Sequence, residues 1–141
     1  MKILLLGKLG LLGSDFLSRL SGSGNFEMFA LDYKDLDITD YKKTEEIITE
    51  IAPDFLINCA AYTDVDGCES NKELAMKVNG EAPANLASVC KKLGAVMLQI
   101  STDYVFDGSK VEGYLEDDKP YPISVYGESK LLGETNVQKY T

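Results

Sequence analysis

The sequence predicts an α/β fold built on a mainly parallel sheet, and three observations lead to this prediction. A length of 141 residues fits one domain of ordinary size. Short apolar runs, typical of strands buried on both faces, alternate with segments of helical periodicity along the whole chain. The first run, at residues 3–6, is followed at once by three glycines and an amphipathic stripe. We therefore expect one domain, residues 1–141, in which helices flank a parallel sheet.

The expected strands are short, and most consist of consecutive apolar residues. They are placed at residues 3–6, 26–31, 36–38, 55–58 and 96–100. Crossover connections between parallel strands are right-handed, and the sheet of a doubly wound fold grows outward from its first strand. We therefore expect the strand order 3-2-1-4-5, with residues 3–6 in the centre.

The expected helices have recognisable start and stop signals. Helices are placed from the glycines to residue 20 and at about 40–50, 71–93 and 125–139, with an exposed loop at 107–119. Thr39 or Asp40 is a candidate N-cap of the second helix, which Pro53 ends. The third helix contains Pro83, a possible break, and Gly94 after it is a suitable C-cap.

The three glycines follow the first strand at positions that suit a phosphate-binding turn. Gly7 allows a tight turn, Gly10 lets backbone N–H groups approach a pyrophosphate, and Gly13 lets the helix pack closely against the sheet. The phosphates then lie at the positive helix N-terminus. The spacing is G-x-x-G-x-x-G and not the usual G-x-G-x-x-G, so a glycine-rich turn without a ligand remains an alternative. The favoured interpretation is a Rossmann-like dinucleotide-binding unit.

Other candidate ligand-binding residues stand where the strands end. Gly7, Asp32, Ala60 and Ser101 follow successive strands, so they are expected at one edge of the sheet. Asp32 is the acid that accepts hydrogen bonds from the ribose hydroxyls of a dinucleotide. Lys34 is a candidate partner for a 2′-phosphate, so the choice between NADH and NADPH stays open.

Composition excludes several classes of function. A net charge of −9 and a pI near 4.5 argue against a nucleic-acid partner, which requires a basic face. No apolar run reaches the roughly 18 residues of a membrane span. The apolar start resembles a short signal peptide, but Lys8 interrupts it and no cleavage site follows, so a cytoplasmic location is expected.

The chain contains three cysteines and no histidine, which limits its chemistry. Cys59, Cys68 and Cys90 lack C-x-x-C spacing and are expected to be reduced thiols in packed positions. Without histidine the usual zinc sites and the usual neutral-pH base are missing, so no metal is expected. Acid–base chemistry must then depend on Tyr, Lys, Asp, Glu or Cys.

The pentad Tyr126-Gly-Glu-Ser-Lys130 is the clearest chemical signal in the chain. On a helix, residues four apart lie on one face, so the phenol and the ammonium can share a pocket. A nearby ammonium lowers a tyrosine pKa from about 10 toward neutrality. The pair would then serve as a proton donor for a carbonyl group that is being reduced.

Taken together, these motifs resemble the extended short-chain dehydrogenase/reductase family, and within it the group of the dTDP-4-dehydrorhamnose reductases. The resemblance covers the whole chain and rests on the segments 7–13, 36–40, 58–66, 68–69, 78–79, 82–83, 101–106 and 126–134. Segments 58–66 and 101–106 are specific to the reductase group, whereas the others are shared with related epimerases.

The resemblance implies roles for individual residues. Residues implied to bind the cofactor, NADPH or NADH, are Gly7, Gly10, Leu11, Leu12, Asp32, Asp37, Ile38, Ala60, Ala61, Thr63, Tyr126 and Lys130. Residues implied to contact the dTDP-sugar are Val65, Thr102, Asp103 and Tyr104. Thr102 would polarise the C4 carbonyl, Tyr126 would protonate its oxygen, and Lys130 would bind the nicotinamide ribose and tune Tyr126.

The implied activity is the NAD(P)H-dependent reduction of dTDP-4-dehydro-L-rhamnose to dTDP-L-rhamnose, a step of cell-surface polysaccharide synthesis. A 4,6-dehydratase would carry an Asp-Glu pair after Thr102, but here Asp103 is followed by Tyr104. Two alternatives remain. One is an NDP-sugar epimerase, which uses the same triad, and the other is a non-catalytic regulatory relative, which keeps the nucleotide-binding fold. Members of the family continue well beyond residue 141, so the chain is expected to lack most of the sugar site and to be poorly active alone. The implied reductase activity is compatible with a homo-oligomer.

Overall fold

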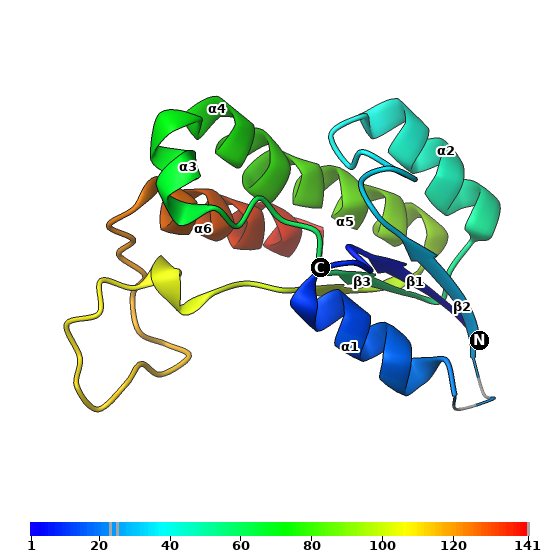
Figure 1. The fold of residues 1–141 in the computed structure, drawn as a ribbon, viewed down its shortest axis with the longest axis horizontal. Helices are drawn as coiled ribbons and strands as arrows, with labels where there is room; N and C mark the ends of the chain where they lie inside the picture. Colours follow the sequence, from blue (N-terminus) through cyan, green and yellow to red (C-terminus); the bar gives the residue numbers. More distant parts are fainter. Residues whose placement is uncertain (23, 25, 141) are drawn as a thin grey trace.

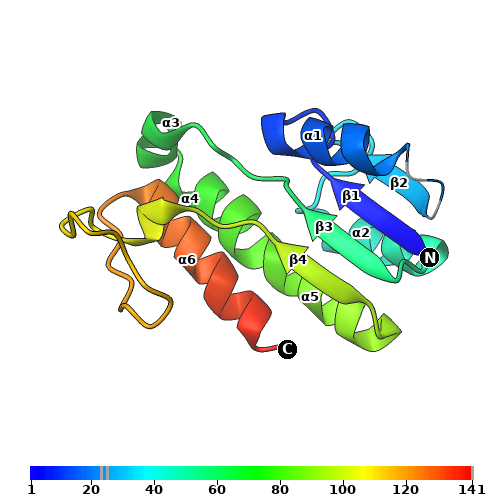
Figure 2. The same cartoon turned by 90° about the horizontal axis from the view of Figure 1, so that it is seen from below.

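Four parallel strands form the sheet of the computed structural model, which describes residues 1–22, 24 and 26–140. The strands are β1 (Lys2–Leu6), β2 (Glu27–Leu31), β3 (Phe55–Asn58) and β4 (Val96–Gln99). They lie in the order β2-β1-β3-β4, and every pairing is parallel (Figure 2). The predicted fold class and the central position of the first strand are confirmed.

The strand predicted at 36–38 is not formed, so the expected order lacks its outermost member. The chain turns sharply after β2, because the N–H groups of Asp35 and Leu36 both donate to the Asp32 carbonyl at 2.8 Å. Leu36 and Ile38 are nevertheless buried, since both pack into the core beside β2. Their apolar character therefore reflects core packing and not strand pairing.

The helices largely follow the predicted positions. They are α1 (Leu11–Leu20), α2 (Tyr41–Ile51), α3 (Val65–Ser70), α4 (Lys72–Ala75), a π-helical segment η1 (Met76–Glu81), α5 (Ala82–Leu93), a 3-10 turn η2 (Asp103–Val105) and α6 (Val125–Gln138). Asp40 is the N-cap of α2 and accepts from the Lys43 N–H at 3.1 Å. Gly94 ends α5 in the left-handed conformation that its position was expected to need.

The single helix predicted at 71–93 is wrong in its details. α3 precedes it, capped by the Asp64 carboxylate, and the chain then passes through α4 and η1 before α5 begins. Pro83 does not break the helix but lies in the first turn of α5. A proline there cannot donate to the carbonyl of Asn79, and the preceding turn has widened to the π form.

Helices cover both faces of the sheet (Figure 1). On one face Ile3, Leu5 and Ile57 pack against α1. On the other face a larger cluster joins Leu4 and Leu56 to residues of α2 and α5. Alternate residues of each strand therefore serve two separate cores, as expected of a parallel sheet buried on both sides.

α6 lies against η1 and α5, and its backbone comes close to the backbone of η1. A Cβ atom added at Gly133 would lie 2.3 Å from the Asn79 carbonyl oxygen, so only glycine permits this approach. The Asn136 side chain donates to the Gly80 carbonyl at 3.0 Å. This packing fixes the position of the helix that carries Tyr126 and Lys130.

The loop predicted at 107–119 projects from the body of the domain in both views (Figures 1 and 2). Phe106 and Tyr114 stack with ring centroids 4.1 Å apart. The Tyr114 hydroxyl donates to the Asp107 carboxylate at 2.6 Å, and Lys110 pairs with Asp118. The loop is exposed as expected, but it is ordered by its own contacts.

β4 forms an edge of the sheet, since it pairs only with β3 among the residues that the structure describes. Val96 and Leu98 on this strand are 56% and 47% exposed. In the described part of the chain, none of the helices has the length and apolar content needed to cross a membrane.

Candidate cofactor and active site

A cavity of about 380 Å³ opens at the carboxyl ends of β1, β2 and β3. It is lined by Leu6, Gly7, Leu9, Gly10, Leu31, Asp32, Tyr33, Leu36, Asp37, Ile38, Cys59, Ala60, Ala61 and Val78. Seven of the predicted cofactor-binding residues are thus brought to one place: Gly7, Gly10, Asp32, Asp37, Ile38, Ala60 and Ala61. The cavity lies at the edge of the sheet where parallel α/β folds bind their ligands.

The glycine turn is shaped by two close backbone contacts. Gly7 has φ +81°, and a Cβ atom there would come within 2.8 Å of the Ala60 nitrogen. A Cβ atom at Gly13 would lie 2.0 Å from the Gly7 carbonyl oxygen, so α1 starts directly against the turn. At Gly10, in contrast, a Cβ atom would meet only the Gly7 oxygen, at 3.4 Å. Gly7 and Gly13 therefore maintain the turn, whereas Gly10 leaves its surface open toward the cavity.

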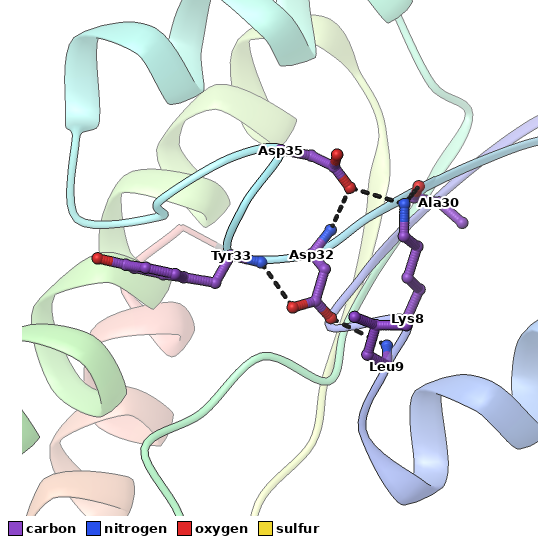
Figure 3. A network of polar contacts seen from close by, with 6 residues as sticks. All are labelled: Lys8, Leu9, Ala30, Asp32, Tyr33 and Asp35. Carbon is purple, nitrogen blue, oxygen red and sulfur yellow. Dashed lines mark hydrogen bonds and ion pairs between the residues drawn. The ribbon is translucent and has the colours of Figure 1, made fainter.

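Asp32 joins the glycine turn to the end of β2 (Figure 3). One carboxylate oxygen accepts from the Leu9 N–H at 2.9 Å and the other from the Tyr33 N–H at 2.8 Å. An ionised carboxylate has about four acceptor positions, so Asp32 keeps acceptors for two further donors. Its place in the cavity suits the recognition of ribose hydroxyls.

Other predicted cofactor residues lie around this centre. Leu11 and Leu12 are exposed at the start of α1, and Thr63 is exposed beyond the end of β3. None of the three lines the cavity. Their proposed contacts with a pyrophosphate or a nicotinamide stay predictions.

The residues of the cavity fit an adenine dinucleotide. The open backbone at Gly10 and the N-terminus of α1 would hold the pyrophosphate, and Asp32 would hold the adenosine ribose. Asp37 and Ile38 line the same cavity, and their proposed contact with the adenine stays a prediction. Among the residues described, no group of three or more His, Cys, Asp or Glu is arranged to hold a metal ion.

A second group of predicted residues gathers where η2 meets the start of α6. Ser124 caps α6, since its hydroxyl accepts from the Gly127 N–H at 3.1 Å. Tyr126 then faces the ring of Tyr104 edge-on, with centroids 5.5 Å apart. A Cβ atom at Gly127 would lie 2.2 Å from the Tyr104 carbonyl oxygen, so this glycine allows η2 to approach the helix.

Lys130 is 4% exposed, and its ammonium donates to the Ile100 carbonyl at 2.5 Å. Burial lowers the Lys130 pKa, while the Glu134 carboxylate, one turn further along α6, raises it in part. Glu134 in turn accepts a hydrogen bond from the Ser101 hydroxyl. α6 is therefore bound to the end of β4, directly beside Thr102.

The Tyr126 pKa does not shift in the predicted direction. Burial raises the pKa above 10, and the Thr102 hydroxyl lowers it only in part. The expectation of a lowered pKa is wrong for this structure, because the Lys130 ammonium is directed to the Ile100 carbonyl and the phenol lies in a partly apolar site. Tyr126 therefore keeps its proton at neutral pH, which suits a proton donor.

The residues predicted to contact the sugar lie around Tyr126. Val65 packs against the cluster that contains Cys68 and Tyr126. The Thr102 hydroxyl donates to the Asp103 carboxylate at 3.1 Å. Asp103 and Tyr104 line a further cavity with residues of the projecting loop. Sugar binding by these four residues stays a prediction.

Sequence reasoning did not assign a role to Asn79, which links the two groups of residues. Its side chain accepts from the Tyr62 N–H at 2.8 Å and donates to the Tyr62 carbonyl at 2.9 Å. It also donates to the Ser129 hydroxyl at 3.0 Å, and Ser129 donates to the Tyr126 carbonyl at 2.7 Å. Asn79 is 2% exposed. The available signal was its place in the segment 78–79, one of those that carry the family resemblance.

Comparison with known sequences identifies the family. The model of the family described as "RmlD substrate binding domain" matches residues 1–141. The chain belongs to this RmlD family. A dTDP-4-dehydrorhamnose reductase of Streptomyces griseus is 45% identical over 134 residues, which covers 95% of this chain and 44% of that protein. The resemblance seen in the sequence is thus confirmed.

Solved structures of RmlD relatives have the same fold. A dTDP-4-dehydrorhamnose reductase of Clostridium acetobutylicum is 44% identical with a TM-score of 0.96, and the match covers all of this chain and 50% of that one. The Bacillus anthracis reductase, solved in complex with NADP, is 38% identical with a TM-score of 0.94, and the match covers 98% and 49%. The chain therefore spans about half the length of the relatives that it matches.

Proposed function

We propose that residues 1–141 form the cofactor-binding and proton-donating half of an NAD(P)H-dependent reductase. Its substrate is dTDP-4-dehydro-L-rhamnose, and its product is dTDP-L-rhamnose. The relatives named above as dTDP-4-dehydrorhamnose reductases support this substrate, and the NADP bound by the Bacillus anthracis relative supports the cofactor.

One observation carries the proposal. The dinucleotide cavity and the group formed by Thr102, Tyr126 and Lys130 lie at the same edge of the sheet, joined through the segment after β3. Ala61 lines the cavity, and the side chain of Asn79 forms hydrogen bonds with both backbone polar groups of the next residue, Tyr62. Asn79 also reaches the helix of Tyr126 through Ser129. A reducing cofactor and a proton donor can therefore act on one carbonyl group.

The bound dihydronicotinamide would supply the hydride that reduces the sugar C4. The Tyr126 phenol would donate its proton to the carbonyl oxygen, and its raised pKa keeps it protonated until that moment. The Thr102 hydroxyl would donate to the same oxygen and polarise the carbonyl. Lys130, one turn further along α6, would hold the nicotinamide ribose.

Cofactor binding can be tested on the chain itself. Titration with NADH and NADPH, followed by nucleotide fluorescence and calorimetry, should show saturable binding to wild type. Asp32→Ala should weaken NADH more than NADPH, because it removes the acceptor for a free 2′-hydroxyl. Equal losses for both nucleotides would mean that Asp32 only shapes the turn.

Turnover needs the sugar-binding half found in longer relatives. A chimera that joins residues 1–141 to the C-terminal half of the Clostridium acetobutylicum relative would be tested with dTDP-4-dehydro-L-rhamnose. Consumption of NAD(P)H should match formation of dTDP-L-rhamnose, and Tyr126→Phe should reduce kcat at least about 100-fold because the proton donor is lost. An epimerase would convert the sugar without net NAD(P)H consumption, and a regulatory relative would bind the nucleotide without turnover.

A further inference from the structure

An ion pair between Lys8 and Asp35 lies next to the cavity lining, since Gly7, Leu9 and Leu36 line the cavity and are chain neighbours of these two residues. The pair has no role in the contacts proposed above. The Lys8 ammonium donates to the Asp35 carboxylate at 2.6 Å and to the Ala30 carbonyl at 3.1 Å (Figure 3). The two side chains are 28% and 41% exposed. Lys8 belongs to the glycine turn and Asp35 to the turn after β2, so the pair joins two segments whose neighbouring residues, Gly7 and Asp32, line the cavity.

The pair is connected to Asp32. The carboxylate oxygen of Asp35 that pairs with Lys8 also accepts from the Asp32 N–H at 3.0 Å. The carboxylate of Asp32 in turn accepts from the N–H of Leu9, the residue after Lys8. Lys8 and Asp35 therefore belong to the same network as the acid proposed to bind the adenosine ribose, as Figure 3 shows.

Charged side chains near a bound ribose affect how well a 2′-phosphate is tolerated. A phosphate monoester carries nearly two negative charges at neutral pH, and lysine binds it as a point charge. In this structure the Lys8 ammonium already has a carboxylate partner, and this hydrogen bond lowers the Asp35 pKa, so the partner stays ionised. The Asp32 carboxylate adds a further negative charge beside the ribose position.

We propose that Asp35 sets the cofactor preference: it holds the Lys8 ammonium away from a 2′-phosphate, so that the chain prefers NADH to NADPH. The inference rests on the proposed function, because it assumes that a dinucleotide occupies the cavity. The Bacillus anthracis relative was solved in complex with NADP. We therefore expect the Lys8–Asp35 ion pair to set a preference between the cofactors and not to exclude the phosphorylated one.

The test measures dissociation constants of NADH and NADPH for the 141-residue chain by calorimetry at low salt. Wild type should bind NADH more tightly. Asp35→Asn keeps an oxygen acceptor for the Asp32 N–H but frees the Lys8 charge. The ratio of the NADH dissociation constant to the NADPH dissociation constant should therefore change about five-fold in favour of NADPH. Lys8→Met leaves the Asp35 charge unpaired, and the ratio should shift by a similar factor toward NADH. The double variant should return close to the wild-type ratio, because removing one positive and one negative charge leaves the local net charge unchanged.

Matched controls separate this effect from net charge. Lys42 and Glu46 form an exposed pair on α2, 3.8 Å apart and outside the cavity lining. Lys42→Met changes the net charge as Lys8→Met does, and Glu46→Gln changes it as Asp35→Asn does, but both should leave the ratio of the dissociation constants unaltered. Far-UV circular dichroism checks that each variant is folded.

Three results would overturn the inference. An unmoved ratio in folded Asp35→Asn, with both nucleotides still bound, would overturn it and leave the proposed function intact. A ratio that changes in Lys34→Met but in neither Lys8→Met nor Asp35→Asn would assign the preference to Lys34. Binding of neither nucleotide to wild type would overturn the proposed function together with this inference.

Discussion

The Lys130 ammonium donates a hydrogen bond to the Ile100 backbone carbonyl at 2.5 Å. This contact joins the middle of α6 to the end of β4, where the chain turns toward Thr102. Lys130 lies almost wholly inside the domain, so its position depends on this carbonyl and on the packing of α6. The residue proposed to hold the nicotinamide ribose is therefore also part of the structural link between helix and sheet.

Replacement of Lys130 by Met should lower both stability and cofactor affinity. The Ile100 carbonyl would lose a buried donor, which costs about 1–3 kcal/mol. Chemical unfolding would measure this loss, and calorimetry with NADH would measure the affinity. Lys77→Met, at an exposed position of η1, is the control and should change the unfolding free energy by less than about 0.5 kcal/mol. A fully stable Lys130→Met chain would contradict the structural role.

Two glycines of the same turn should respond differently to alanine. Gly13→Ala places a Cβ atom 2.0 Å from the Gly7 carbonyl oxygen, so the domain should lose about 1–3 kcal/mol or more of stability. Gly10→Ala meets only a contact at 3.4 Å and should cost less than about 1 kcal/mol. Gly10→Ala should nevertheless weaken NADH binding at least tenfold, because the methyl group occupies the surface left for the pyrophosphate. Normal binding by the folded variant would show that Gly10 is not at a phosphate site.

Cys59 should be the most reactive of the three thiols. It is half-buried and lines the dinucleotide cavity, whereas Cys68 and Cys90 are buried. Burial raises the Cys59 pKa, but the Lys130 charge lowers it in part; burial alone raises the Cys90 pKa to about 11. A disulfide reagent should therefore modify Cys59 first, and saturating NADH should slow this reaction. Cys59→Ser should remove the fast phase of the modification reaction, which assigns that phase to Cys59. A reaction rate that NADH leaves unchanged would argue against nucleotide binding in this cavity.

The projecting loop should loosen in acid. Hydrogen bonds from Tyr114 and Ser109 lower the Asp107 pKa to about 2. A lowered folded pKa contributes stability above the unfolded pKa of about 3.9, and this contribution is lost as the pH falls through the folded value of about 2. Near-UV circular dichroism should show Tyr114 losing its fixed environment in this window. Asp107→Asn should show a weaker pH dependence there, and an identical acid transition would contradict the assignment.

The exposed edge of β4 should promote self-association. Among the described residues this strand pairs only with β3, and Val96 and Leu98 present apolar surface. Unpaired edge strands join other chains, and lysine at an edge opposes this. Leu98→Lys should therefore reduce concentration-dependent association in sedimentation experiments. Val111→Lys, at a 96% exposed loop position, is the control and should leave the concentration-dependent association unchanged. Monomeric wild type at all concentrations would contradict the prediction.

The sequence alone determined the layout of this protein. Apolar runs and helical periodicity located the four strands and most helices, and parallel connections require the strand ends to meet at one edge. The positions of Gly7, Gly13 and Asp32 followed from that layout, and helical spacing placed Tyr126 and Lys130 on one helix. These features were predictable because each depends on local pattern or on simple chain topology.

Tertiary structure alone decided the remaining features, because they depend on contacts between distant segments. Leu36 and Ile38 look like a strand in sequence but are buried by packing, and the widened turn at Asn79 appears only where η1 meets α6. The direction of the Tyr126 pKa shift depends on burial and on where the Lys130 ammonium points, and spacing cannot specify either. Likewise, Lys8 and Asp35 are 27 residues apart, and only the folded chain brings their charges together.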